Sequence, residues 1–174
     1  MELIDNELKL RPFKESDAKK LALLCNNRKI WDNLRDYIPF PYSEQNAKDF
    51  IELCKNENPQ FTFAIEVNGD FVGCIGLVKQ TDVYKLTAEI GYWIGEPYWR
   101  MGITTRAARL ISEYGFDNLG LMRIFAGVFD FNKGSQKVLE KVGFKLECIF
   151  EKSIFKNGKI CNKYRYGLIN KNAS

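Results

Sequence analysis

Residues Tyr98–Phe116 read YWRMGITTRAARLISEYGF, and this stretch decides the fold. Before it lies Thr87–Ile94, whose β-branched and aromatic residues predict a strand. Its second half repeats apolar residues at helical spacing, which predicts an amphipathic helix; they are Ala107, Leu110, Ile111 and Tyr114. The sequence therefore predicts a strand, a loop that contains Gly102, and a helix, in that order.

The join between this strand and this helix has the features of a phosphate site. Gly102 lets the backbone approach a ligand closely, and the first turn of a helix leaves N–H groups without intrahelical partners. These donors and the positive end of the helix dipole suit an anion. The alternative is an ordinary connection that Thr104 or Thr105 caps, and the segment alone favours neither. Five basic residues are expected around the site: Arg100, Arg106, Arg109, Lys133 and Lys137.

Four ordered blocks between residues 88 and 144 match the pattern of a known family. They read AEIGYWI at 88–94, PYWRMGITT at 97–105, FNKGS at 131–135 and LEKVGF at 139–144. These blocks resemble the GNAT superfamily of acetyltransferases, and within it the RimJ/RimL-like branch that acetylates the N-termini of ribosomal proteins. The phosphate loop of the superfamily usually reads Gln/Arg-x-x-Gly-x-Gly/Ala. Here Trp99, Gly102 and Thr104 hold its first, fourth and sixth places; Trp is familiar at the first place, whereas Thr104 departs from the pattern.

The resemblance implies a single α+β domain over residues 1–174, with a mixed, mostly antiparallel central sheet and helices on both faces. It also implies that the strand ending near Ile94 and the strand ending near Phe131 splay apart, so that acetyl-CoA fills the gap between them. For Asn132 an Asx turn is the alternative reading. The residues expected to bind the cofactor are Trp93, Ile94, Gly95, Arg100, Met101, Gly102, Ile103, Thr104, Thr105 and Asn132.

Capping and turn signals divide the rest of the chain. Ser43 is expected to cap one helix, and Ser135 to cap another over Gln136–Val142. Asn68-Gly69 and Asn157-Gly158 each predict a hairpin turn. The segment 37–42 holds two prolines and three aromatic residues, so it is a stiff loop that either plugs the core or walls the acceptor pocket.

Composition excludes several classes of protein. The 174 residues are 45% hydrophobic, which suits one soluble domain, and no run approaches the roughly 20 apolar residues of a membrane span. No signal-peptide profile is present, and five scattered cysteines predict reduced thiols in the cytoplasm. The absence of histidine removes Ser-His and Cys-His catalysis, and no metal site is expected. The net charge of +4 is dispersed, so neither nucleic acid nor membrane is an expected partner.

The chemistry implied by the resemblance is direct attack of a neutral amine on the acetyl-CoA thioester. It needs a base for the amine proton and a donor for the leaving thiol. We expect Glu89 to act as the base, directly or through water; the alternative is an exposed or salt-bridged carboxylate. We expect Ser135 to serve the thiol; the alternative is pure N-capping. Many GNAT enzymes use a tyrosine seven residues after the asparagine, and that place here is Leu139.

The acceptor is expected to be a protein or peptide N-terminal α-amine. Such an amine has a pKa of ~8, so about a tenth is neutral at pH 7, whereas an amine with a pKa of ~10.4 is almost wholly protonated. Two alternatives remain open. One is a small amine (a polyamine, an amino sugar or an antibiotic), and the other is a non-catalytic module that binds acyl-CoA. A monomer or a homodimer fits the sequence equally.

Overall fold

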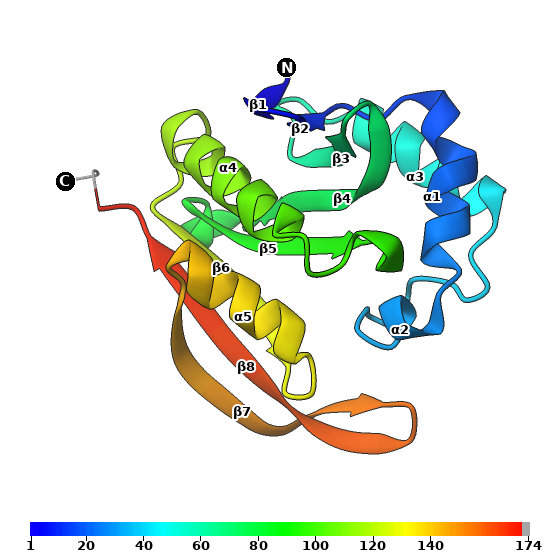
Figure 1. Ribbon diagram of the computed structural model, residues 1–174. Helices are drawn as coiled ribbons and strands as arrows, with labels where there is room; N and C mark the ends of the chain where they lie inside the picture. Colours follow the sequence, from blue (N-terminus) through cyan, green and yellow to red (C-terminus); the bar gives the residue numbers. More distant parts are fainter. Residues whose placement is uncertain (172–174) are drawn as a thin grey trace.

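The computed structural model describes residues 1–171, which fold around one eight-stranded sheet (Figure 1). Its order is β1-β2-β3-β4-β5-β6-β8-β7, and all neighbours are antiparallel except β5 and β6. The strands are β1 (Leu3–Asp5), β2 (Leu8–Arg11), β3 (Thr62–Val67), β4 (Asp70–Lys79), β5 (Thr87–Ile94), β6 (Arg123–Phe129), β7 (Lys145–Lys156) and β8 (Lys159–Ile169). The α-helices are α1 (Ala18–Cys25), α2 (Arg28–Trp31), α3 (Glu44–Lys55), α4 (Ile103–Asp117) and α5 (Lys133–Val142). The predicted α+β fold with a mixed, mostly antiparallel sheet is confirmed.

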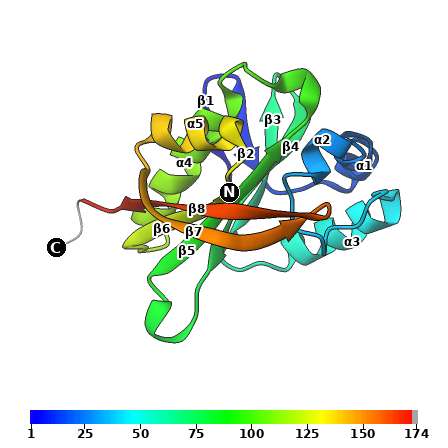
Figure 2. The same ribbon diagram turned by 90° about the horizontal axis from the view of Figure 1, so that it is seen from below.

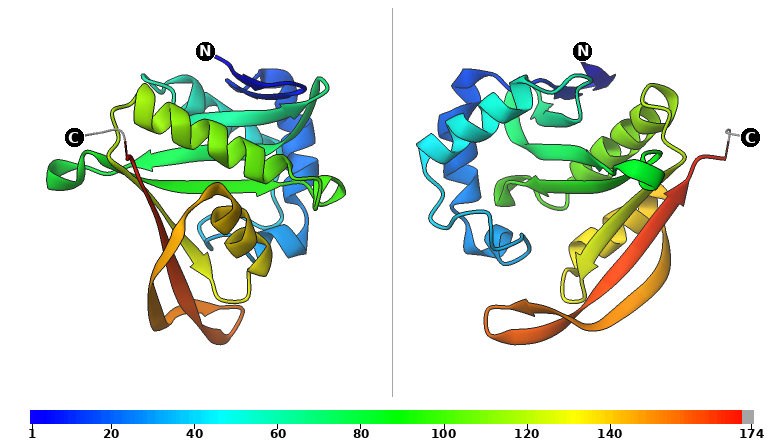
Figure 3. Two further views of the ribbon diagram at one scale, coloured as in Figure 1. Left: turned by 60° about the vertical axis from the view of Figure 1, so that its left-hand side comes forward. Right: turned by 180° about the vertical axis from the view of Figure 1, so that it is seen from behind.

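Helices cover both faces of the sheet, as predicted (Figures 2 and 3). On one face α4 and α5 pack side by side, and Ile111 and Leu139 join the larger buried cluster with residues of β2 to β6 and β8. On the other face α1 and α3 contribute Leu21 and Ile51 to a second buried cluster. That second cluster reaches only as far as Trp93 of β5, so the helices leave the sheet beyond β5 open on this face.

Local signals position most of these elements. Ser43 caps α3 and accepts a hydrogen bond from the Asn46 amide, as predicted. Both predicted hairpin turns join consecutive strands, β3 to β4 and β7 to β8. The prediction for Ser135 was wrong, because α5 begins at Lys133 and its cap is Asn132, whose side chain accepts from the Ser135 amide at 3.1 Å. An amide at the start of the helix is thereby satisfied by Asn132, and the Ser135 hydroxyl is left for another partner.

Strands β5 and β6 separate soon after they meet. Their parallel pairing joins Thr87–Glu89 to Arg123–Phe125 and stops there, although β5 continues to Ile94 and β6 to Phe129. The two strands therefore open into a gap towards the ends from which α4 and α5 begin. The predicted splay is present, and it leaves backbone groups of both strands without a partner strand.

The tip of the β7–β8 hairpin docks on α2 and the loop after it. The ammonium of Lys156 contacts Asp36 at 2.5 Å and lies 3.6 Å from the centroid of the Trp31 ring. Asn157 donates to Asp32 at 2.8 Å. These contacts join segments more than 100 residues apart and hold α2 against the far end of the sheet.

Two residues of segment 37–42 pack into the core, and the other four are exposed. Tyr42 is buried in the cluster beneath α1 and α3, and Ile38 packs against the same cluster. Phe40 instead lies half-exposed against the Trp31 ring, with centroids 5.5 Å apart.

Thiols and membrane-spanning segments bear on the compartment predicted from sequence. Cys25, Cys54 and Cys74 are buried, and none of the five cysteines, all within residues 1–171, forms a disulfide. Burial raises the pKa of Cys25 and Cys54 to about 12, so neither thiol is a nucleophile near neutral pH. No helix of the described chain is long and apolar enough to cross a bilayer. The cytoplasmic location stays a prediction.

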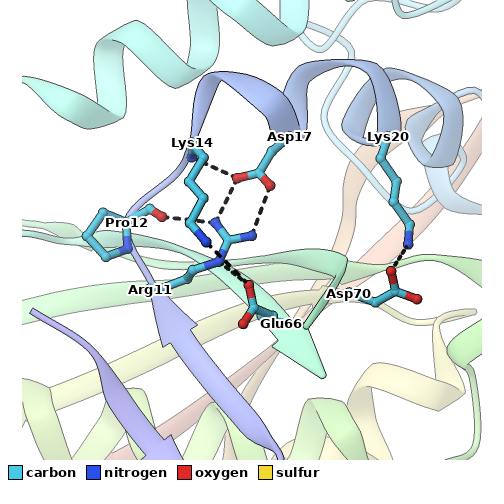
Figure 4. Close-up of polar contacts among 7 residues, drawn as sticks. All are labelled: Arg11, Pro12, Lys14, Asp17, Lys20, Glu66 and Asp70. Atoms are coloured by element: carbon cyan, nitrogen blue, oxygen red, sulfur yellow. Dashed lines mark hydrogen bonds and ion pairs between the residues drawn. The ribbon is translucent and has the colours of Figure 1, made fainter. Parts of the chain in front are cut away.

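A buried ion network joins β2 to the start of α1 and to β3 (Figure 4). The Arg11 guanidinium contacts Asp17 at 2.7 and 2.9 Å and Glu66 at 2.5 Å, and all three side chains are less than a tenth exposed. Asp17 also accepts from the Lys14 amide at 2.8 Å. Because each carboxylate has lost its water, the network depends on the single guanidinium that they share.

Replacing Arg11 with Ala should lower the free energy of unfolding by about 3–5 kcal/mol, because two buried carboxylates would lose their cation. The matched control is Lys14→Ala, since the Lys14 side chain is 61% exposed and its ammonium lies 3.9 Å from Glu66. That variant should change the same free energy by less than about 1 kcal/mol. Urea titrations followed by circular dichroism measure both, and similar losses in the two variants would contradict the proposed role of Arg11.

Candidate active site

The gap between β5 and β6 opens into a cavity of about 790 Å³. The end of β5, the loop before α4, the first turn of α4, the start of α5, and α2 with the loop after it all line this cavity. Most of the residues expected to hold the cofactor meet here, although they come from separate elements. Those that line it are Trp93, Ile94, Arg100, Gly102, Ile103, Thr104, Thr105 and Asn132, and Ser135 lies among them.

The N-terminus of α4 forms one end of the cavity. Gly102 adopts a left-handed conformation with φ of +77°, and no side chain caps the helix there. The amides of Ile103, Thr104 and Thr105 therefore begin the helix without intrahelical partners. Side chains cap α2, α3 and α5, and α1, which also lacks a side-chain cap, continues directly from a 3-10 turn at Glu15–Asp17. The uncapped end of α4 suits an anion with several oxygen atoms.

The charges around the cavity have one sign. Five cationic residues line it, and no Asp or Glu does among the described residues; the cations are Lys29, Arg100, Lys133, Lys137 and Lys141. Lys29 is paired with Glu96 just outside the lining. A cavity of this kind attracts a ligand with several negative charges, such as a polyphosphate.

Two arginines expected at the phosphate site lie elsewhere. Arg106 contacts the N-terminal hairpin, with its Nε 2.6 Å from Asp5 and a further bond of 2.5 Å to Glu7. Arg109 is exposed on α4 and exerts its charge on Asp5. The expectation that both surround the phosphate was wrong, because helical geometry turns these positions away from the cavity. Lys29 and Lys141 supply positive charge there instead.

Some of the predicted cofactor ligands are already engaged or lie outside the cavity. The Gly95 amide donates to the Val72 carbonyl of β4 at 2.9 Å. The Ile94 carbonyl accepts from the Trp99 indole at 2.8 Å and keeps a second lone pair. Met101 is exposed and, like Gly95, does not line the cavity.

A pair of hydroxyl groups spans the gap between the separated strands. The phenol oxygen of Tyr92, on β5, lies 2.8 Å from the Ser135 hydroxyl oxygen on α5. Both residues line the cavity, and burial raises the pKa of the Tyr92 phenol well above its usual value. Tyr92 therefore stays a neutral hydrogen-bond donor throughout the physiological range. Leu139, at the place of the family tyrosine, is fully buried in the core and offers no hydroxyl.

Glu89 is the last residue of β5 that pairs with β6. It lies on the face of β5 opposite to that of Tyr92. One terminal nitrogen of Arg35 contacts both of its carboxylate oxygens at 2.9 Å. The Glu89 side chain is 22% exposed and does not line the cavity. Because a single nitrogen makes both contacts, each oxygen keeps capacity to accept a further hydrogen bond.

Around Glu89 lies a stretch of sheet that no helix covers, which we call the open sheet face. It consists of Glu89 and Gly91 on β5, Phe125 and Gly127 on β6, and Lys163 and Arg165 on β8. Both glycines are exposed although they lie within the sheet. A methyl group on Gly127 would lie 3.4 Å from the Glu89 carboxylate and 3.2 Å from the Lys163 stem, so both side chains reach over it. Bare backbone of this kind lets a ligand approach closely.

Comparison with known proteins gives the family. Residues 7–145 match the Acetyltransferase (GNAT) domain family. The chain is 33% identical to YjcK of Bacillus subtilis, a probable N-acetyltransferase, over 86% of each protein. It is 28% identical to the spermidine N(1)-acetyltransferase of Escherichia coli, over 92% of this chain and 84% of that enzyme. The structure of RimL, the ribosomal L7/L12 α-N-protein acetyltransferase solved with coenzyme A, superposes with a TM-score of 0.85 at 18% identity, covering 97% and 98% of the two chains.

The chain belongs to the GNAT family of acetyltransferases. It is an acetyl-CoA-dependent N-acetyltransferase, and acetyl-CoA is its acetyl donor. The cationic cavity and the uncapped helix fit the phosphates of that donor. The relatives include both a polyamine enzyme and a protein N-terminal enzyme, so the RimJ/RimL-like branch is not established by them.

Sequence reasoning missed Tyr92, Arg35 and Arg165. A signal for Tyr92 was present, because it alternates with Ile90 and Ile94 on the buried side of a strand, where a phenol needs a polar partner. No sequence signal places Arg35 or Arg165 near Glu89, since each lies more than 50 residues away along the chain.

Replacing Gly102 with Val should weaken acetyl-CoA binding about tenfold or more, because the side chain would occupy the space of the phosphates. A Cβ atom at Gly102 meets no protein atom within 4 Å, so the loss would not come from a clash inside the protein. Isothermal calorimetry measures the affinity.

The control for backbone strain is Gly69→Val. Gly69 has a φ of +83°, meets no atom within 4 Å of its added Cβ, and lies in the β3–β4 turn away from the cavity. It should destabilise the protein to a similar degree and leave the affinity for acetyl-CoA unchanged. Normal affinity in the Gly102 variant would overturn the phosphate assignment.

Proposed function

We propose that this protein transfers the acetyl group of acetyl-CoA to the α-amine of a peptide or protein N-terminus. The observation that carries the proposal is the gap between β5 and β6, which has a cationic cavity on one side and a carboxylate beside exposed sheet on the other. When bound, acetyl-CoA supplies the reactive thioester. The phosphate end would rest on Arg100, Gly102, Ile103, Thr104 and Thr105, and the arm against Trp93, Ile94 and Asn132.

Glu89 would accept the proton of the attacking amine, directly or through one water. Its position at the end of the β5–β6 pairing supports this role, because the gap begins at that residue. The contact with Arg35 orients the carboxylate while leaving it able to accept a hydrogen bond from an amine. In this proposal Glu89 is therefore both the salt-bridged carboxylate and the base.

Ser135 would donate a hydrogen bond to the leaving thiolate, and Tyr92 would hold the serine hydroxyl in place. In this proposal the Tyr92 phenol donates to the Ser135 oxygen, a direction that the 2.8 Å contact between the two oxygens allows, and the serine proton is free to point into the cavity. Because Asn132 caps α5, capping does not compete for the Ser135 hydroxyl. Asn132 accepts through its side-chain oxygen. Its side-chain nitrogen has no protein partner within residues 1–171, so that nitrogen can donate a hydrogen bond to the cofactor arm.

Two arguments favour an α-amine over a polyamine. An amine with a pKa of ~8 needs far less help from a base than one with a pKa of ~10.4. The open sheet face, moreover, carries one carboxylate, already paired with Arg35, and two further cations, Lys163 and Arg165. A polycation such as spermidine would be repelled there. The similarity to a spermidine enzyme makes this alternative worth a direct test.

Thiol release from acetyl-CoA tests the function. Peptides that begin with Ala or Ser should give the highest kcat/KM, and spermidine and amino sugars should give values at least about tenfold lower. Faster turnover of spermidine would transfer the assignment to a polyamine enzyme. Tight binding of acetyl-CoA without turnover of any amine would support a non-catalytic module instead.

Replacing Ser135 with Ala should lower kcat about 10²-fold, and Tyr92→Phe should lower it by a smaller factor, because each removes one hydroxyl of the pair. Affinity for acetyl-CoA, measured by calorimetry, should change little in both. Ser153→Ala and Tyr84→Phe are the matched controls, since both residues are exposed and lie outside the cavity. An unaltered kcat in Ser135→Ala would remove the serine from the mechanism.

A further inference from the structure

Arg165 differs from the other arginines that are at least partly buried. Arg11, Arg106 and Arg123 each contact a carboxylate. Arg165 is partly buried as well, yet within residues 1–171 it has no carboxylate within ion-pair distance. Removing a guanidinium from water without an anion is unfavourable, so an unpaired arginine at this depth calls for an explanation.

Arg165 holds its positive charge on the same face of the sheet as Glu89. Its guanidinium lies over the Phe125 ring, 3.8 Å from the centroid, which fixes it against the open sheet face. In the β6–β8 register Arg165 stands opposite Gly127, the glycine over which Glu89 reaches. Strand β8 lies two strands from β5, about 10 Å at about 4.8 Å for each strand, and the Phe125 ring under the guanidinium stands opposite Glu89 in the β5–β6 register. The guanidinium and the Glu89 carboxylate are therefore within one short ligand's reach of each other.

The charge of the open sheet face is unbalanced. Arg35 already neutralises Glu89, through two contacts of 2.9 Å. Lys163, which also reaches over Gly127, has its ammonium 4.9 Å from the Phe150 ring centroid and, in the described part of the chain, no carboxylate partner. Two positive charges therefore remain beside the proposed base.

We propose that the acceptor carries a carboxylate close to its amine, and that Arg165, with Lys163, binds it. For the peptide acceptor proposed above, on which this inference rests, this means Asp or Glu within the first three residues. The α-amine lies at Glu89, beside the bare backbone of Gly91. The acidic side chain lies two strands away from Glu89, on the guanidinium of Arg165 in β8.

Three peptides test the preference, each beginning with Ser and ending in an amide so that side chains alone carry charge. They contain Asp-Asp, Ser-Ser or Lys-Lys at the second and third positions. The acidic peptide should have a kcat/KM about tenfold above the neutral one, and the basic peptide should be the poorest. Raising the ionic strength from about 0.05 to 0.5 M should shrink the acidic advantage, because salt screens exposed charges.

Variants of Arg165 identify the residue responsible. Arg165→Gln should bring the acidic and neutral peptides to similar kcat/KM, while Arg165→Lys should retain part of the difference. The control is Arg109→Gln, which removes an arginine from the exposed side of α4, and it should leave the ratio unchanged. A purely structural role for Arg165 would lower both peptides equally and preserve their ratio, which would overturn the proposal.

The outcomes separate this inference from the function on which it rests. Equal turnover of acidic and neutral peptides by the unmodified enzyme would overturn the preference and leave N-terminal acetylation in place. Failure of every peptide, together with turnover of a small amine, would overturn both.

Discussion

The short parallel contact between β5 and β6 is the constraint on which the rest of the structure depends. Pairing over Thr87–Glu89 holds the two strands together at one end, and their separation beyond it opens the cavity. Continued pairing would fill the space with backbone hydrogen bonds and leave no room for a ligand. The separation is stable because α4 and α5 pack across the same face, burying Ile111 and Leu139. The gap is thus supported by packing and not by the strands themselves.

The two faces of the sheet divide the chemistry between them. On the face that α4 and α5 cover, cations and an uncapped helix end surround the cavity. On the other face, α1 and α3 stop short of β6, so Glu89 and two exposed glycines meet open space. A donor and an acceptor can therefore approach the same gap from opposite sides. Direct transfer needs the two reacting groups to be held together at one point, and this arrangement allows it.

Tertiary contacts also decide which charges are available for binding. Arg106 forms ion pairs with Asp5 and Glu7, and Arg35 forms one with Glu89. Arg100 and Arg165 have no such partner in the described chain, and they stand respectively in the cavity and on the open sheet face. A count of arginines in the sequence cannot distinguish these cases, because the partners lie tens of residues away and meet only in the folded chain.

Local signals in the sequence determined most of the elements and the glycine junction at Gly102, because periodicity, caps and turn residues act within a few positions of each other. The fold class followed from the family resemblance of the four blocks between residues 88 and 144. Sequence reasoning placed Ser135 near the cavity but gave it the wrong structural role, since Asn132 is an equally good cap three residues earlier. Only the tertiary structure brought Tyr92 to Ser135 and left Arg165 unpaired beside Glu89. These relations depend on how far two strands diverge and which helices cover them, and long-range packing sets both.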